Sequence, residues 1–250
     1  MAVAPRRPRD PVVQPAVVAE PVWWREEAHG LARWWVMGGS LEDARFPLPD
    51  VESEQPLSVF VVGALLRNID FSGLTFDALY IAGSILDHCR FEAVSIQRVG
   101  FGVLQFHRDW RFPINWSKPL PEDSPRYRET VYTNCTFADS KLPPRNTHFG
   151  NSRFDQCLFQ DVLRSTVVAP LFTHPAEFIA CKFTGRVSCT VFDGTVRPNS
   201  VRRLGRATCE IARNDFSAAT LKSVDFRAVD LRAQMMPPGF VVPIEASRDR

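Results

Sequence analysis

Lysine and long apolar runs are both scarce in this 250-residue sequence. Only four of its 30 lysine and arginine residues are lysines, and the formal net charge is +2. No apolar run approaches the ~18–20 residues that a membrane-spanning helix needs, so we predict no membrane span. Prolines interrupt residues 1–19, and we expect a disordered proline-rich tail there rather than a signal peptide.

Catalytic and metal-binding motifs are also absent from the sequence. It contains no HExxH, GxSxG or phosphate-binding loop, and its five histidines have no nucleophile motif beside them. Its six cysteines form no CxxC pair, the spacing that would indicate zinc. We therefore predict that the protein is not an enzyme and that it holds no catalytic residues, no metal and no cofactor.

The sequence does contain a large apolar residue at every fifth position of one long segment, with a second and usually smaller residue two positions before each. A period of five matches neither the 3.6 of a helix nor the 2 of a flat strand. It indicates a chain that turns a corner every five residues and closes a square coil in twenty. The series runs through Leu66, Phe71, Phe76, Ile81, Leu86, Phe91, Ile96, Phe101 and Phe106.

The same spacing returns three times further along the chain. Shorter series occupy residues 137–159 and 178–183, and a run of six closes the pattern at residues 211–236. Five of the six cysteines stand at the smaller position, where a free thiol behaves as a small buried hydrophobe. Buried free thiols are typical of a reducing cytosol, so we expect a cytoplasmic protein. In the last run the large residues predicted to lie in the core are Phe216, Leu221, Phe226 and Leu231.

This five-residue repeat resembles that of the pentapeptide-repeat family over most of residues 57–236. The resemblance implies an all-β solenoid, a right-handed quadrilateral β-helix in which the large and small repeat positions both point inward. Neighbouring coils would then stack at about 4.8 Å, as adjacent strands do. Because each coil is buried only by its neighbours, both ends of such a solenoid need caps.

The repeat divides the chain into four parts. We predict a tail over residues 1–19, an N-terminal helix and cap over 20–56, the β-helix over 57–236, and a C-terminal cap or tail over 237–250. Insertions interrupt the β-helix near residues 107–133, 163–175 and 194–207.

The N-terminal helix is predicted over residues 21–37. Pro21 suits a first helical turn, and Gly38 and Gly39 suit the end. An apolar stripe at helical spacing includes Trp24 and Trp35. We favour a helix that covers the open first coil, with a tryptophan-rich docking helix for a partner as the alternative.

Two of the insertions combine cationic and aromatic residues, and we predict that they contact a partner. The alternatives are a first insertion that packs against its own coils and a third that is merely solvated. Within residues 194–207 there is no acidic residue. The predicted contact residues are Arg108, Trp110, Arg111, Trp116 and Lys118 in the first insertion, and Arg197, Arg202, Arg203 and Arg206 in the third.

A non-enzymatic protein-interaction scaffold is the function we predict, with loops and coil faces binding a protein partner. The family resemblance implies an alternative, protection or inhibition of type II topoisomerases (gyrase or topoisomerase IV), which would confer antibiotic resistance or self-immunity on a bacterial host. Members with that activity are acidic, dimeric rods resembling B-form DNA, whereas this chain has a net charge of +2. Direct nucleic-acid binding ranks lower, and the apolar residues 235–244 predict either a monomer's cap or a C-terminal homodimer contact.

Overall fold

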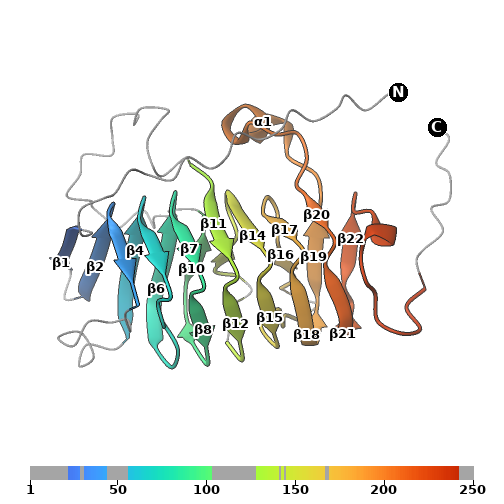
Figure 1. Ribbon diagram of the computed structural model, residues 1–250, viewed down its shortest axis with the longest axis horizontal. Coiled ribbons are helices and arrows are strands. Elements are labelled where there is room, and N and C mark those ends of the chain that lie inside the picture. The colour runs from blue at the N-terminus through green and yellow to red at the C-terminus, as the bar shows by residue number, and fades with distance from the viewer. Residues whose placement is uncertain are drawn as a thin grey trace.

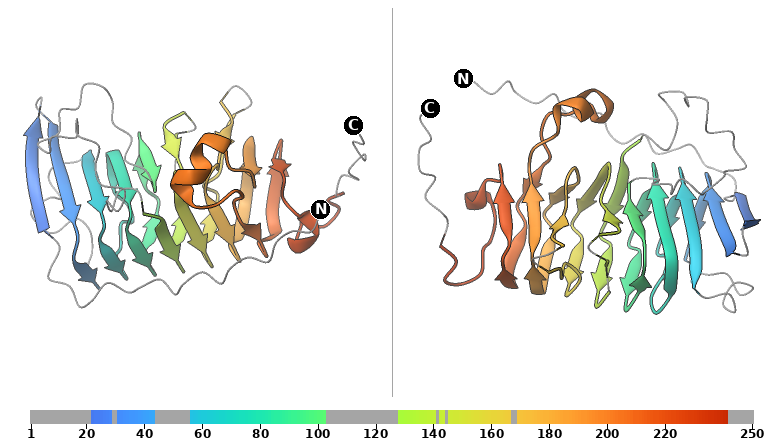
Figure 2. Two further views of the ribbon diagram at one scale, coloured as in Figure 1. Left: turned by 90° about the horizontal axis from the view of Figure 1, so that it is seen from above. Right: turned by 180° about the vertical axis from the view of Figure 1, so that it is seen from behind.

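The structure is a computed structural model that describes residues 22–28, 31–43, 56–102, 128–140, 142–143, 145–166 and 169–241. Its coils stack along one long axis, from β1 at one end to β22 at the other (Figures 1 and 2). Apart from the antiparallel pair β1 and β2, the named strands pair in parallel. The predicted β-helical solenoid is confirmed.

Four sheets, which we number I to IV, contain the strands. Sheet I holds β1 (Val22–Ala28), β2 (Leu31–Met37), β4 (Leu57–Val62), β6 (Thr75–Ala82), β9 (Ser95–Ile96), β10 (Val99–Phe101) and β13 (Thr147–His148). Sheet II holds β3 (Ser40–Glu42), β5 (Leu65–Arg67), β7 (Ile85–Asp87), β11 (Thr130–Thr133), β14 (Ser152–Asp155), β17 (Glu177–Ile179) and β20 (Ile211–Ala212).

The remaining strands form two smaller sheets. Sheet III holds β8 (Arg90–Glu92), β12 (Thr136–Ala138), β15 (Leu158–Gln160), β18 (Lys182–Ser188) and β21 (Asp215–Lys222). Sheet IV holds β16 (Leu171–Phe172), β19 (Thr190–Asp193) and β22 (Asp225–Arg227). The helices are α1 (Pro198–Leu204) and the 3₁₀ turn η3 (Leu231–Ala233). Within the described ranges, no helix has the length and apolarity that a membrane crossing requires.

One coil takes twenty residues because each side takes five. Leu66, Phe71, Phe76 and Ile81 are buried on four successive sides, and Leu86 then lies beside Leu66 in the next coil. The corner after each strand of sheet II is a residue with a left-handed backbone, from Asp43 at φ 52° to Arg213 at φ 58°. The five-residue spacing of the sequence is therefore the length of one side plus its corner.

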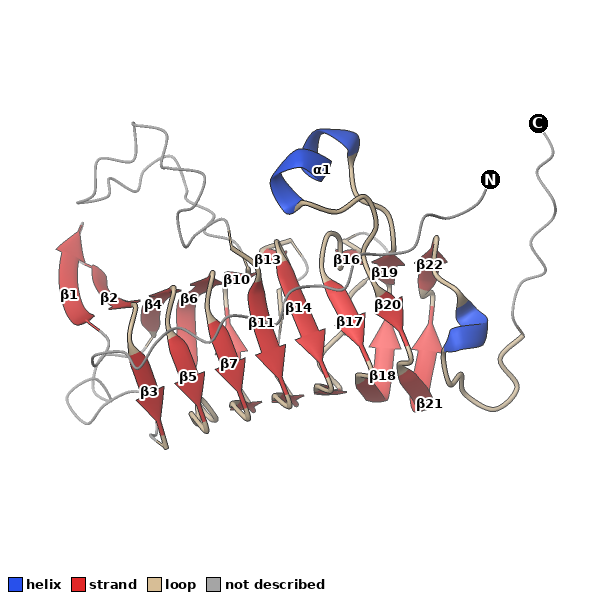
Figure 3. Cartoon of the chain, turned by 45° about the horizontal axis from the view of Figure 1, so that its top comes forward, coloured by secondary structure: helices blue, strands red, loops and turns tan. Residues whose placement is uncertain are grey.

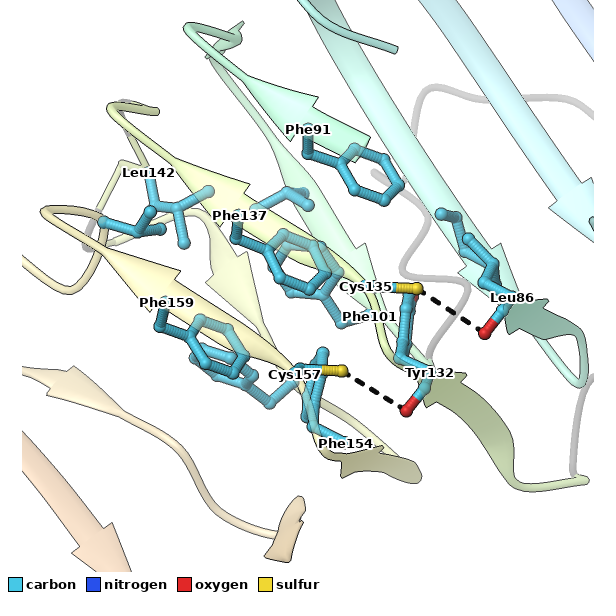
Figure 4. Packing of buried hydrophobic residues seen from close by; sticks show 14 of the residues in the cluster. Leu86, Phe91, Phe101, Tyr132, Cys135, Phe137, Leu142, Phe154, Cys157 and Phe159 are labelled. Carbon is cyan, nitrogen blue, oxygen red and sulfur yellow. Dashed lines mark hydrogen bonds between the residues drawn. The ribbon is translucent and has the colours of Figure 1, made fainter. Parts of the chain in front are cut away.

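Stacked aromatic rings fill the interior. Six phenylalanines from consecutive coils, five of them on strands of sheet III and the sixth Phe71, lie face to face with ring centroids 4.5–5.2 Å apart. Figure 4 shows three of them, Phe91, Phe137 and Phe159, beside a second column that includes Tyr132 and Phe154. These spacings match the 4.7–4.9 Å between hydrogen-bonded strands, so ring stacking and strand pairing reinforce each other.

Four cysteines form a column at the corner between sheets II and III. All six cysteines are free and buried. Each thiol of the column donates to a backbone carbonyl of the preceding coil; Cys135 reaches Leu86 O at 3.5 Å and Cys157 reaches Tyr132 O at 3.4 Å (Figure 4). Burial raises the pKa of the Cys157 thiol, so this group stays protonated inside the coil.

The predicted N-terminal helix is not present. Residues 22–28 and 31–37 form an antiparallel pair of strands instead, and β2 then pairs in parallel with β4. The segment is rich in tryptophan and valine, which suit strands as well as helices. A strand is favoured over a helix here because β4 would otherwise be an open sheet edge. Pairing with β2 satisfies the backbone N–H and C=O groups of β4, whereas a helix packed across that edge would leave them unpaired.

The predicted insertions match the structure unevenly. The segment from 194 to 207 leaves the coil and contains α1. The insertion predicted at 107–133 includes β11, and the insertion predicted at 163–175 includes β16. Part of each predicted insertion therefore belongs to the strands of the coils. The coils also begin earlier than residue 57, because β2 and β3 already pair with β4 and β5. Residues 1–19 and 103–127 lie outside the described ranges, as does 242–250.

Burial of the predicted core residues depends on their position along the stack. Phe106 lies outside the described residues. On the last coil Leu221, Phe226 and Leu231 are half-buried, since no further coil within the described residues covers them, although Phe240 contacts Phe226 edge-on at 6.5 Å. The others have at most 5% of their surface exposed: Phe71, Phe76, Ile81, Leu86, Phe91, Ile96, Phe101 and Phe216.

Replacing Phe154 with alanine is expected to lower the free energy of unfolding by about 3–5 kcal/mol, because the ring is fully buried in its column between Tyr132 and Phe178. The matched variant Phe226→Ala removes the same atoms from a half-buried ring and should cost roughly half as much or less. Urea denaturation followed by circular dichroism measures both. Equal losses would contradict a last coil that is only partly covered.

Candidate functional site

One side of the coil is interrupted halfway along the molecule. Sheet I ends at β13, which pairs with β10, and sheet IV begins at β16, which pairs with β19. Both β13 and β16 directly precede a strand of sheet II, so they occupy the same side of successive coils, yet they are not paired with each other. Sheet II runs past the same point without a break, as Figure 3 shows.

A groove of about 610 Å³ lies at this interruption. Its walls are residues 145–150 around β13, residues 169–175 around β16, residues 193–197 after β19, and Arg227 of β22. Phe172 stands in the groove with 49% of its surface exposed, whereas the large aromatic residues of the coils are mostly buried. We call this feature the β13–β16 groove.

Positive charge predominates in the β13–β16 groove. Arg145 and Arg197 are exposed, and in the described part of the chain neither has an ion-pair partner. Arg227 also lines the groove, and its Nε donates to Asp225 Oδ2 at 2.7 Å. Asp193 is the single lining carboxylate, and its Oδ1 accepts bonds from the backbone N–H and the hydroxyl of Thr195 at 2.9 and 2.7 Å.

Two histidines also line the groove. His148 on β13 is half-buried, and this burial lowers its pKa below the usual value, so its ring is neutral at pH 7. His174 follows β16 and donates through Nδ1 to Thr195 O at 3.0 Å. The groove thus offers guanidinium groups and imidazole rings to a ligand.

The helix α1 projects from the rod close to this groove, at the top of Figure 1. It begins with Pro198 in its first turn and ends at Gly205, whose left-handed backbone (φ 64°) lets its N–H reach Val201 O. Arg197, the residue before the helix, is part of the groove lining. The third insertion and the groove therefore share one face.

Arg206 anchors this insertion to the coils. Its Nη1 donates to Glu129 Oε1 at 2.5 Å, its Nη2 donates to Pro175 O at 2.9 Å, and its Nε lies 3.6 Å from Glu177 Oε1. Glu177 is completely buried and also accepts the backbone N–H of Glu210. A buried carboxylate needs such partners, so Arg206 has a structural role here.

The predicted contact residues have different positions in the structure. Arg197 lines the groove, Arg202 is exposed on α1, and Arg203 also belongs to α1. The Arg206 guanidinium is turned inward by its ion pairs with Glu129 and Glu177, which come from other coils, and its partner contact stays a prediction. The contact residues of the first insertion lie outside the described residues: Arg108, Trp110, Arg111, Trp116 and Lys118.

Sequence reasoning missed Arg145, Phe172 and Arg227. They come from three separate coils, and only the failure of β13 to pair with β16 brings them to one groove. The available signal was the loss of the five-residue register between residues 160 and 177. In the described ranges, no three histidine, cysteine or acidic side chains are grouped so as to hold a metal ion.

Comparison with known proteins adds two distant structures. No family model and no curated protein matches the chain. QnrB1, a plasmid-mediated fluoroquinolone resistance protein, is 12% identical with a TM-score of 0.20, over 80% of this chain and 75% of its own. HetL, a pentapeptide-repeat protein involved in heterocyst differentiation regulation from the cyanobacterium Nostoc sp. strain PCC 7120, is 10% identical with a TM-score of 0.21, over 83% and 91%. At these values neither bears on function.

Replacing Arg206 with methionine is expected to lower the free energy of unfolding by about 3–5 kcal/mol, because it leaves the Glu177 carboxylate buried without its cation. Adding Glu177→Gln to that variant should recover part of the loss. The control Arg197→Met removes an exposed arginine from the same insertion and should change stability by no more than about 0.5 kcal/mol. Urea denaturation measures all three, and equal effects of R206M and R197M would refute the anchoring role.

Proposed function

We propose that this pentapeptide-repeat β-helix is a non-enzymatic scaffold that binds a protein partner through the face carrying the β13–β16 groove and α1. The interior is filled by stacked rings, so a ligand must be met on the surface. The observation that carries the proposal is the interruption between β13 and β16, where exposed arginines and Phe172 line a groove.

The other sides of the coil offer less to a partner. Ion pairs along sheets II and III neutralise their own charges, as between Arg67 and Glu42 at 3.1 Å and between Arg90 and Glu92 at 2.9 Å. Such exposed pairs contribute little to stability, but they leave few unmatched charges for a partner. At the groove, by contrast, Arg145 and Arg197 lie in one lining and have no ion-pair partner in the described part of the chain, which favours that face.

The first insertion belongs to the same proposal. Gly102, the last described residue before it, lies against the coil that carries β13, since Asn151 N donates to Gly102 O at 2.9 Å. A Cβ on Gly102 would come within 2.7 Å of the Asn151 backbone, so these two coils approach too closely for any side chain. Gly102 therefore lies beside the coil of β13, and we propose that Arg108, Trp110, Arg111, Trp116 and Lys118 contribute to partner contacts on this face.

Topoisomerase protection by imitation of duplex DNA is the weaker candidate. It needs a continuous acidic face to match one negative charge per ~1.7 Å of duplex. On the described part of sheets II and III, acidic side chains alternate with arginines that pair with them, as Asp155 pairs with Arg153 at 3.0 Å. This arrangement supports the scaffold over the mimic.

Photo-crosslinking tests the scaffold directly. A photoreactive amino acid placed at Phe172 in the groove, and separately at Arg202 on α1, is expected to capture the same protein from a lysate of the source organism. The control position is Arg186, which is exposed on β18. Adducts are identified by mass spectrometry and checked by reciprocal pull-down. The same adducts from all three positions would contradict a dedicated binding face.

A further inference from the structure

We propose that the β13–β16 groove is a docking site for an extended acidic segment of a partner protein, which adds as a short strand beside β16. This inference rests on the scaffold function and specifies the chemistry of the partner. Three features of the groove carry it: the direction of the backbone groups, the excess of positive charge, and the exposed ring of Phe172.

The backbone of β16 presents one unoccupied edge to the groove. Leu171 N donates to Cys189 O at 2.9 Å and Thr173 N donates to Val191 O at 3.1 Å, so both residues direct their backbone groups toward β19. Successive residues of a strand direct these groups to opposite edges. The N–H and C=O of Phe172 therefore point toward β13, with which β16 has no pairing.

The opposite wall has the complementary arrangement. Val99 N donates to Asn146 O at 2.9 Å, which directs this carbonyl toward β10, and Val99 is paired with Thr147. In a parallel pair of this register the backbone N–H and C=O of Thr147 point away from β10, toward β16. An extended peptide in the groove thus meets backbone donors and acceptors on both sides, the mode of recognition in which main-chain bonds give affinity and alternate side chains give specificity.

The flanking prolines limit the length of the added strand. Pro170 and Pro175 bracket β16 and have no N–H to donate, so Phe172 supplies the donor of this edge. A docked segment is consequently short, with one residue paired to Phe172 and its neighbours in contact with the groove walls.

Charge selects an acidic segment. Arg145 and Arg197 have no ion-pair partner in the described part of the chain, and Asp193 is occupied by Thr195. Guanidinium groups bind carboxylates with two parallel hydrogen bonds, which a lysine-rich peptide could not use. Alternating acidic and apolar residues would place carboxylates at the arginines and apolar side chains against Phe172.

The test is fluorescence anisotropy of a rhodamine-labelled octapeptide of alternating glutamate and valine, titrated with the full-length protein. We expect saturable binding that weakens at least roughly tenfold, or about 1.4 kcal/mol, in the double variant Arg145→Gln/Arg197→Gln. The control Arg186→Gln, which removes an exposed arginine outside the groove, should bind like the unaltered protein. Circular dichroism of each variant confirms that it is folded.

Three further probes separate the alternatives. A lysine–valine octapeptide should not bind, and the glutamate–valine octapeptide with alternate backbone nitrogens methylated should bind at least roughly tenfold more weakly, since it cannot donate to the strand edge. Equal binding of the methylated peptide, complete competition by inorganic phosphate at similar concentrations, or tighter binding of a dT oligonucleotide would each overturn the strand-docking site.

The outcome also distinguishes this inference from the scaffold on which it rests. Peptide binding that depends on both arginines, without any protein captured at Phe172 or Arg202, would preserve the docking site and refute the scaffold. A partner captured at those positions, with no binding of the octapeptide by the unaltered protein, would preserve the scaffold and refute the docking site.

Discussion

Stacking between equivalent side chains of successive coils is the interaction on which the rest of this structure depends. Phe154 lies on Tyr132 at 4.6 Å and on Phe178 at 5.0 Å, which is close to the distance that the backbone ladder sets between strands. Because rings and strands share one spacing, a residue that fits the column also fixes the register of its strand. The number of residues at the corners of a coil can then vary, provided that the stacked side chains keep their positions.

This tolerance explains how a binding surface arises on so regular a fold. The interior column of sheet II continues from β14 to β17 through Phe154 and Phe178, whose stacked rings are 5.0 Å apart, while β13 and β16 on the neighbouring side are not paired. The open ladder leaves backbone groups and arginines at a groove, and the Arg206 ion pairs with Glu129 and Glu177 hold the α1 insertion beside it. The core supplies rigidity, and the interruption supplies the place for a partner.

The sequence predicted the coils well because their signal is local. A large residue every five positions specifies the sides and corners, and Phe71, Phe76 and Ile81 are buried as that spacing requires. The N-terminal strands were missed because the pairing of β2 with β4 spans an intervening segment and overrides the helical spacing of the tryptophans. The groove was missed for the same reason. Arg145 and Arg197 are 52 positions apart, and only the unpaired side joins them.

Amide hydrogen exchange across β16 tests the central claim, that the ladder is open between β13 and β16. Leu171 and Thr173 donate to carbonyls of the next coil, whereas the Phe172 N–H points into the groove. The account predicts that the Phe172 amide exchanges at least about a hundredfold faster than both neighbours, a difference of roughly 2.7 kcal/mol in opening free energy. Equal protection of all three amides would mean that β13 and β16 are paired, and the groove would not exist.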